Sequence, residues 1–285
     1  MKILEQGLFT GERALYNSRE LRIYDSTFAD GESPLKESSD IEIYGSIFKW
    51  KYPLWYCKNI KTESSVLLET ARSGIWYTER IRMENCVIDA PKTFRRSSDI
   101  ELVGVNMPNA LESMWGCRGV RLMDVELVGD YFGMNCSSVE ADNLTVNGNY
   151  IFDGGRDIVV RNSTLISKDA FWNCENVTVI DSRIIGEYLG WNSKNLRFVR
   201  CTIESDQGLC YIDDLKLEDC KISNSPLSFE YSTVDATVEL GEGVSIKNPI
   251  SGSITARGEC ELILEPERID PTRTSISFIG EKDGF

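Results

Sequence analysis

The sequence predicts an all-β fold, a single-stranded right-handed parallel β-helix, and three observations support it. An apolar residue, here called the anchor, recurs every 19–21 residues along most of the chain. Further apolar positions lie two and seven residues after each anchor. No 3.6-residue period appears, which excludes a repeat built on helices. A steady period of about twenty residues indicates a solenoid of about eleven to twelve coils. The anchors are Leu21, Ile41, Ile60, Ile81, Ile100, Val120, Val139, Ile158, Val177, Leu196 and Leu215.

Each coil is expected to contain three short strands. The anchor and the apolar residue two after it alternate with polar residues, as in a strand with one buried face. Asp, Asn, Gly and Ser are common one residue before the anchor and four after it, which predicts turns. Stacked coils would lie about 4.8 Å apart. The apolar positions then form columns inside the coils, and the polar positions lie outside.

The repeat also predicts the domain organisation. We expect one β-helix domain over residues 1–285, with regular coils over residues 18–233. Residues 1–17 precede the first full coil and are expected to cap it. Residues 234–285 leave the period and are expected to form an irregular final coil and a C-terminal cap. Caps are expected because the open end of a solenoid exposes unpaired backbone groups.

Charge and composition exclude several classes of function. The net charge is −14, so a nucleic acid or an anionic membrane is not expected as a partner. The absence of histidine excludes Ser-His-Asp and Cys-His catalysis and histidine-ligated metals. None of the nine cysteines forms a C-x-x-C pair, and we expect no metal site and no cofactor. With no recognisable signal peptide, the free thiols favour a cytoplasmic location.

Five of the six tryptophans share one position, five residues before the anchor. The same column contains Lys36, Arg95 and Asp153, which could not be buried unpaired without a large cost in free energy. We therefore expect this tryptophan column to face outward, with its rings stacked between adjacent coils. Burial of so much apolar area would be favourable, so something is expected to cover the column. Sugar rings, a second protomer and the C-terminal tail are the three candidates.

Carboxylates lie close to the tryptophan column and suggest a glycoside site. Asp153, Asp169 and Glu187 are the candidate catalytic residues. The backbones of Asp169 and Glu187 are expected roughly 6 Å apart, from one coil step and one strand step. The alternative interpretation is a solvated acidic face, which is common in a chain of this charge. The candidate ligand-binding residues are Trp55, Trp76, Arg95, Glu112, Trp115, Asp130, Tyr131, Tyr150, Trp172, Asn173, Tyr188, Trp191, Asn192 and Tyr211.

Three further side-chain positions carry expectations. Cysteines that recur three residues before the anchor or five after it are expected to pack inside the coils. Cys210 falls in the tryptophan column and is the one cysteine that is a candidate for a reactive thiol. Arg95 and Arg96 are expected to pair with Glu112, with an anionic ligand as the alternative.

Several segments resemble a known bacterial β-helix family. These are FTGERALYNS, DGESPLKESSDI, WKYPLWYCKNI, APKTFRRS, SKDAFWNCENV and GEYLGWNSKNL, and the likeness extends over residues 1–255. That family has no assigned activity, so the resemblance implies a fold and no mechanism. The wider pattern resembles the pectin-lyase-like superfold, which includes pectate lyases and polygalacturonases. The chain lacks their signatures, such as the Gly-His-Gly of polygalacturonases, so the fold alone implies little about function.

Two functions remain open from the sequence. The first is a carbohydrate-binding or carbohydrate-active protein that holds an oligosaccharide on the tryptophan column. If it is an enzyme, it would be a glycoside hydrolase or similar to a polysaccharide lyase, without a catalytic histidine. The second is a scaffold, or a homo-oligomer, whose tryptophan column is a protein interface.

Overall fold

The computed structural model describes residues 1–280 and shows an all-β parallel β-solenoid of about 15 turns. Its described helices are two short 3-10 segments, η1 (Glu69–Ala71) and η2 (Pro271–Arg273). No helix among residues 1–280 is long and apolar enough to cross a membrane. The chain divides into two compact units, Met1–Asn147 and Gly148–Phe285, and the sequence period gives no sign of this boundary.

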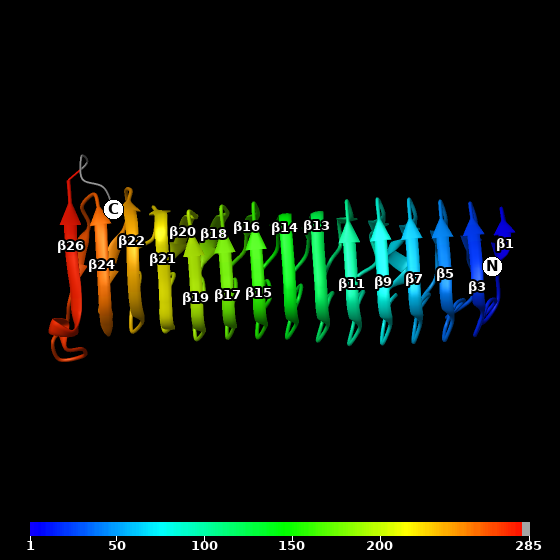
Figure 1. Ribbon diagram of the computed structural model, residues 1–285, viewed down its shortest axis with the longest axis horizontal. Helices are drawn as coiled ribbons and strands as arrows, with labels where there is room; N and C mark the ends of the chain where they lie inside the picture. The colour runs from blue at the N-terminus through cyan, green and yellow to red at the C-terminus, as the bar shows by residue number, and fades with distance from the viewer. Residues whose placement is uncertain (281–285) are drawn as a thin grey trace. The chain divides into compact units, whose positions relative to one another are not determined.

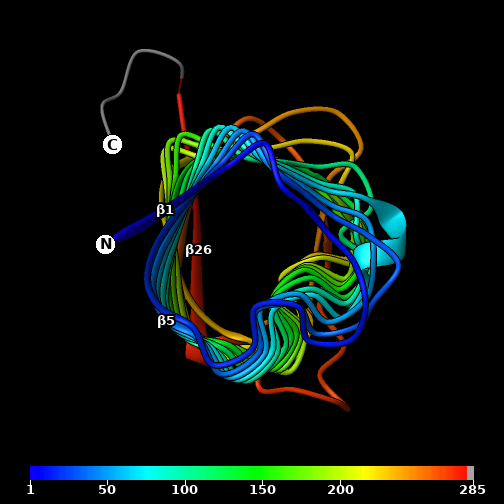
Figure 2. The ribbon, with the colours of Figure 1, turned by 90° about the vertical axis from the view of Figure 1, so that its right-hand side faces the viewer.

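Unit 1 (Met1–Asn147) contains the first fourteen strands, and most of its coils contribute one long and one short strand (Figure 1). Seen end on, its coils follow nearly the same outline, from which η1 projects (Figure 2). The strands are β1 (Lys2–Glu5), β2 (Leu8–Phe9), β3 (Arg19–Tyr24), β4 (Thr27–Phe28), β5 (Ser39–Tyr44), β6 (Ile47–Phe48), β7 (Lys58–Glu63), β8 (Val66–Leu67), β9 (Glu79–Glu84), β10 (Val87–Ile88), β11 (Ser98–Val103), β12 (Asn106–Met107), β13 (Arg118–Val128) and β14 (Ser137–Asn147).

Unit 2, from Gly148 onward, repeats the same arrangement with twelve strands. They are β15 (Arg156–Arg161), β16 (Thr164–Ile166), β17 (Glu175–Ile180), β18 (Arg183–Glu187), β19 (Lys194–Val199), β20 (Thr202–Asp206), β21 (Asp213–Ile222), β22 (Thr233–Leu240), β23 (Ser245–Lys247), β24 (Ser251–Arg257), β25 (Glu261–Ile263) and β26 (Thr274–Ile279).

The register between coils confirms the predicted columns within each unit. In unit 1, Leu21 pairs with Ile41 and Ile41 with Ile60, all in parallel. In unit 2, Val177 pairs with Leu196 in the same way. Every predicted anchor is buried. One apolar column becomes a stack of rings inside the coil, since the ring centroids of Phe28 and Phe48 lie 4.6 Å apart. The periodic apolar positions therefore build the core of both units.

Both ends of the chain hold more coils than the sequence predicts. Residues 1–17, expected as a cap, carry β1 and β2, and Lys2 of β1 pairs with Leu21 of β3 in the ordinary register. After Leu215, β22 pairs with β24 and β24 with β26. The spacing there changes to 18 residues, because Thr233 pairs with Ser251. A search for a period of 19–21 residues therefore does not find these coils. The part of the expected C-terminal cap in residues 281–285 lies outside the described residues.

The expectation of three regular strands per coil is wrong. The segment that contains the tryptophan column is a turn in most coils, because residues with left-handed backbone angles alternate with ordinary ones. In one coil of unit 2, Tyr150, Phe152 and Gly154 have φ angles of 59°, 61° and 68°. Such angles cost free energy in residues other than glycine and interrupt a strand. Coil-to-coil hydrogen bonds, such as that from the Phe171 amide to the Ile151 carbonyl (3.0 Å), hold the turns in place.

The buried hydroxyl of Thr62 provides a test of the core. Thr62 lies in the apolar column two residues after the anchor, and its Oγ1 has no hydrogen-bond partner. We expect Thr62→Val to raise the free energy of unfolding by about 1 kcal/mol, because it removes an unsatisfied polar group without leaving a cavity. Chemical denaturation measures the change. The control is Thr78, whose buried hydroxyl bonds the Leu54 carbonyl at 2.6 Å, so Thr78→Val should lower stability. A loss of stability in Thr62→Val would contradict the assignment.

Candidate functional site

The tryptophan column lies on the outside of each unit, as predicted. Its five rings are half-buried, whereas the residues immediately before them fill the core. In unit 1, Leu54 and Ile75 are fully buried next to Trp55 and Trp76. The backbone of the turn thus directs Leu54 inward, whereas Trp55 and the exposed Tyr56 point outward.

The rings of the column cover one another. Trp55 and Trp76 stack with centroids 5.0 Å apart and planes 8° apart. Trp172 and Trp191 stack less closely, at 5.7 Å and 26°. Because neighbouring rings occupy each other's faces, the column presents mainly ring edges to solvent. A sugar therefore has little room to stack on the ring faces between the two members of each stacked pair.

Four of the five indole N–H groups donate to a carbonyl of the following coil. The bonds in unit 1 are Trp55 Nε1 to Ser73 O (2.6 Å), Trp76 Nε1 to Lys92 O (2.9 Å) and Trp115 Nε1 to Tyr131 O (2.7 Å). In unit 2, Trp191 Nε1 donates to Gln207 O at 2.5 Å. Each of these four rings is thus hydrogen-bonded to the turn of the next coil, which gives the column a structural role.

The column is interrupted in unit 1 by Arg95. Its guanidinium carbon lies 4.7 Å from the ring centroid of Trp76 and 4.6 Å from that of Trp115, so the cation replaces a ring in the stack. The expected pairing of Arg95 and Arg96 with Glu112 is wrong. Glu112 instead forms an ion pair with Lys92, in which Oε2 and Nζ lie 3.0 Å apart.

In unit 2 the column is irregular at Trp172. Its indole N–H, unlike the other four, makes no hydrogen bond to any of residues 1–280. Three residues earlier, Asp169 is only 2% exposed. The Tyr150 hydroxyl hydrogen-bonds the Asp169 carboxylate, yet Asp169 Oδ1 has no partner. One coil thus holds a solvent-accessible indole N–H and a buried carboxylate oxygen that bond no atom of residues 1–280.

The surroundings of this coil are acidic. Burial raises the pKa of Asp169, and the nearby charges of Glu187 and Asp153 raise it further. Burial also raises the pKa of Asp153, although a hydrogen bond from Asn173 opposes this effect. Both aspartates therefore hold their protons to a higher pH than a free aspartate. Asp169 is therefore close enough to Asp153 and to Glu187 for the charge of each to act on it.

Polar side chains continue from these carboxylates into the next coil of unit 2. Asn192 Nδ2 donates to Asn173 Oδ1 at 3.3 Å. Glu187 pairs with Lys168 at 3.2 Å, and the Lys168 ammonium lies 5.1 Å from the ring centroid of Tyr188. The sequence period did not identify Lys168 as a site residue. The departure that it shows is at the next position, where Asp169 stands between Tyr150 and Tyr188 of the adjacent coils.

The remaining predicted site residues divide between the two units. Asp130 and Tyr131 belong to unit 1, where their carbonyls accept bonds from Glu112 N and Trp115 Nε1. Tyr211 of unit 2 is 39% exposed, and its ring is tilted by 54° from that of Trp191. The ring of Tyr231 also lies close, with its centroid 5.5 Å from that of Tyr211 and its plane tilted by 47°, so Tyr211 is partly exposed between two tilted rings. Unit 1 holds Trp55, Trp76, Arg95, Glu112, Trp115, Asp130 and Tyr131; unit 2 holds the other ten.

The prediction of a reactive Cys210 is wrong. Cys210 is fully buried, and burial raises the pKa of its thiol to about 12. Its Sγ lies 3.3 Å from the Leu227 carbonyl, the counterpart of the carbonyl that accepts from Trp191. The side chain occupies the tryptophan position but is short enough for the next coil to cover it.

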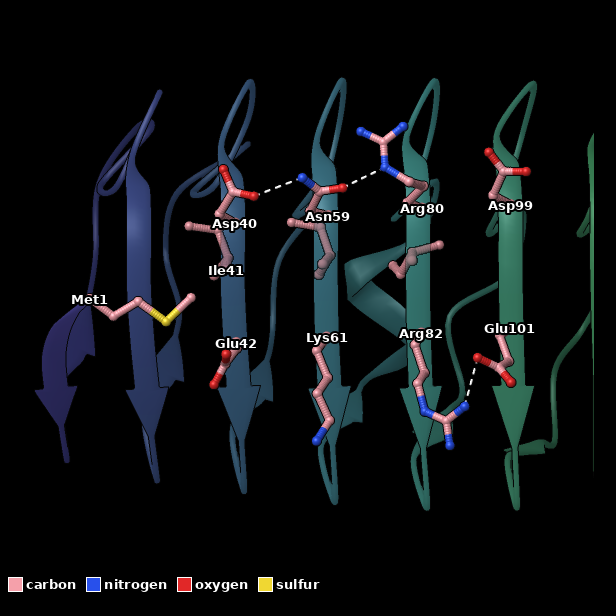
Figure 3. A pocket seen from close by; sticks show the side chains of 12 residues that line it. Met1, Asp40, Ile41, Glu42, Asn59, Lys61, Arg80, Arg82, Asp99 and Glu101 are labelled. Carbon is pink, nitrogen blue, oxygen red and sulfur yellow. Dashed lines mark hydrogen bonds and ion pairs between the residues drawn. The ribbon is translucent and has the colours of Figure 1, made fainter.

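A shallow groove of about 410 Å³ lies elsewhere on unit 1, over β5, β7, β9 and β11. It runs between two rows of outward side chains, with buried isoleucines beneath it (Figure 3). The rows are largely paired internally, for example Arg82 with Glu101 at 2.6 Å and Asn59 with Asp40 at 2.7 Å. These pairs leave few free polar groups for a ligand, so the groove is a weaker candidate than the coil around Asp169. No group of three or more Cys, Asp or Glu among residues 1–280 is placed to hold a metal ion.

Comparison with known proteins identifies a family and no activity. The model of one family, described as a protein of unknown function (DUF3737), matches residues 2–277, which confirms the resemblance to a β-helix family without an assigned activity. No curated protein matches the chain.

Solved structures share only a remote likeness. The A-module of mannuronan C-5 epimerase AlgE4 from Azotobacter vinelandii is 10% identical, with a TM-score of 0.35, and the match covers 98% of this chain and 89% of that one. The periplasmic alginate epimerase AlgG is 9% identical at a TM-score of 0.31, covering 97% and 76%. The plasmid-mediated fluoroquinolone resistance protein QnrB1 is 13% identical at 0.15, covering 84% and 92%. At these TM-scores the likenesses carry no information about activity.

The raised pKa of Asp169 gives a stability test with a definite sign. The folded state binds the Asp169 proton more tightly than the unfolded state, so the ionised carboxylate destabilises the fold above the ordinary pKa of 3.8. We expect Asp169→Asn to raise the free energy of unfolding by about 1 kcal/mol at pH 7. The gain should shrink as the pH falls towards 4, where the wild-type carboxyl regains its proton.

Denaturation at a series of pH values measures this difference. Glu175→Gln is the control, because Glu175 is exposed in β17 and is not one of the charges that shift the pKa of Asp169. A destabilised Asp169→Asn, or a gain that does not change with pH, would show that the Asp169 carboxylate is fully accommodated by the fold.

Proposed function

We propose that this chain, which belongs to the DUF3737 family of proteins of unknown function, binds a neutral oligosaccharide. The proposed site lies on unit 2, around Asp169. One observation carries the proposal. In the coil that contains Asp169 and Trp172, a buried carboxylate oxygen and an indole N–H bond no atom of residues 1–280, whereas the equivalent indole groups of the other coils are bonded to backbone carbonyls.

The chemistry of a sugar hydroxyl suits these two groups. A hydroxyl both donates and accepts, so sugar hydroxyls can donate to Asp169 and accept from the Trp172 indole. Asp169 Oδ1 is shielded from solvent, so the ligand reaches it when a neighbouring side chain moves. Lys168 is the long, flexible neighbour whose charge acts on Asp169. An unsatisfied buried group costs about 1–3 kcal/mol, which binding would recover.

Charge and shape narrow the ligand further. Asp153, Asp169 and Glu187 would repel an anionic sugar, which favours a neutral one. Asn173 and Asn192 extend the row of polar groups into the next coil, so several sugar units could be contacted. The partly exposed ring of Tyr211 offers a contact for an apolar sugar surface beyond the end of the tryptophan stack.

The same residues suit cleavage of a glycosidic bond, should the bound oligosaccharide be a substrate. Such a reaction needs one carboxyl as acid and another as base or nucleophile. We assign the acid to Asp169, because its raised pKa favours the protonated form. Glu187, which is exposed, and Asp153 are the two candidates for the partner.

Calorimetric titration with neutral trisaccharides, such as maltotriose, cellotriose and xylotriose, tests the proposal. We expect one of them to bind the wild type, and Trp172→Phe to weaken that binding about tenfold, which is about 1.4 kcal/mol. Phenylalanine keeps an aromatic ring and removes only the indole and its N–H. Trp76→Phe in unit 1 is the matched control and should bind as the wild type does. No binding by the wild type, or equal affinity in Trp172→Phe, would overturn the proposal.

A second candidate function rests on the aromatic surface of unit 1, formed by Tyr52, Trp55, Tyr56, Trp76 and Tyr77. Tyr56 is 49% exposed and stacks on Tyr77 with centroids 4.8 Å apart. Tyrosine, tryptophan and arginine are enriched where protein interfaces are most tightly packed. This surface favours a contact between two copies of the chain.

Light scattering coupled to size exclusion tests the second candidate. We expect a dimeric wild type and a monomeric Tyr56→Lys/Tyr77→Lys variant, because two added charges cannot be buried at the interface. Tyr24→Lys is the control, since Tyr24 stacks on Tyr44 in a different column of unit 1. A monomeric wild type would contradict this candidate.

A further inference from the structure

Unit 1 places a preorganised cation on its surface at Arg95. The guanidinium is held between the rings of Trp76 and Trp115, each within 4.7 Å of its central carbon. Parallel backbone bridges join Trp76 to Arg95 and Arg95 to Trp115, so the three side chains keep their order. Two such cation–π contacts, one on each side, fix the plane of the guanidinium.

The N–H groups of this guanidinium donate no hydrogen bond to any of residues 1–280. Arg95 Nε is buried without a partner among residues 1–280, and the two Nη groups bond none of these residues and are not fully buried. Arg96 follows in the neighbouring column and is exposed. Among residues 1–280 no carboxylate lies within 4.0 Å of either guanidinium, although acidic residues outnumber basic ones by 45 to 31.

The neighbouring groups do not compete for these donors. Lys92, three residues before Arg95, is paired with Glu112, and its carbonyl accepts the Trp76 indole N–H. Next to Arg96 the following coil contributes Gly116. A Cβ atom built there would touch the Arg96 side chain at 3.9 Å, so the lack of a side chain leaves space beside Arg96.

The geometry selects a planar oxyanion. Because both faces of the Arg95 guanidinium are covered by rings, a ligand can approach only in its plane, from the solvent side where the Nη donors lie. A carboxylate matches that fork with two parallel hydrogen bonds, and such charge-assisted bonds are about twice as strong as neutral ones. Repulsion by the net charge of −14 is screened beyond about 8 Å at physiological ionic strength, so the local contact dominates.

We propose that Arg95 and Arg96 form a carboxylate-binding site at the edge of the Trp76–Arg95–Trp115 stack. Arg95 supplies the fixed fork, and Arg96 adds a second cation from the adjacent column. The site belongs to unit 1 and does not depend on the oligosaccharide site of unit 2. Its ligand is either a small organic acid or an acidic side chain of a protein segment, which share this chemistry.

Nuclear magnetic resonance of the arginine Nε–H groups tests the site directly. Sodium acetate is titrated into the full-length protein at constant ionic strength, with sodium chloride as the exchanged salt. We expect a saturable shift of the Arg95 resonance, assigned by its loss in Arg95→Lys. The lysine variant keeps the charge but removes the planar fork, so acetate affinity, followed by tryptophan fluorescence, should fall about tenfold.

The controls separate this site from general anion binding. Arg118→Lys alters an exposed arginine of unit 1 in another column and should leave acetate affinity unchanged. Circular dichroism confirms that each variant remains folded. A shift that does not saturate, or equal affinity in Arg95→Lys, would overturn the proposal.

A second titration distinguishes the two sources of the carboxylate. Acetyl-Gly-Glu-Gly-amide carries one carboxylate within a peptide. Binding at least about tenfold tighter than acetate identifies a protein segment as the ligand class. Equal affinity identifies small organic acids. Binding of neither probe overturns the site.

Discussion

Parallel pairing between successive coils is the interaction on which the rest of the structure depends. Each strand bonds the strand one coil away, and the buried apolar columns fix the register because a shift of one residue would expose them. The same register places equivalent side chains one above another. Rings stack, amides bond amides, and charges of opposite sign meet, so a repeated position becomes a continuous column within each unit.

In the tryptophan column, most of the contacts that the rings need are supplied by the column itself and by the backbone of the next coil. Each ring covers its neighbour, and four indole groups bond the backbone of the next coil. Functional chemistry is therefore expected where the pattern is broken, because natural sequences depart from local consistency mainly at functional or strained sites. In unit 1 the pattern is broken at Arg95, whose guanidinium has no carboxylate partner among residues 1–280. In unit 2 it is broken at Trp172 and Asp169, whose indole N–H and carboxylate Oδ1 bond none of these residues.

The fold was largely predictable, because the anchors are apolar and evenly spaced and the register follows from them. The extra coils were not, since Lys2 stands where an apolar anchor would be and the later spacings change. The sequence also placed Asp153, Asp169 and Glu187 near the tryptophans. It could not show that Asp169 is buried or that the Trp172 indole bonds none of residues 1–280, because both depend on how the side chains of adjacent coils pack.

Hydrogen exchange of the six indole N–H groups, measured by nuclear magnetic resonance, tests the central claim that the column satisfies itself except at one coil. We expect Trp55, Trp76, Trp115 and Trp191 to exchange slowly, because each donates to a backbone carbonyl. Trp172 should exchange as fast as the exposed Trp50, which lies outside the column. Slow exchange at Trp172, or fast exchange at all five column positions, would contradict the account.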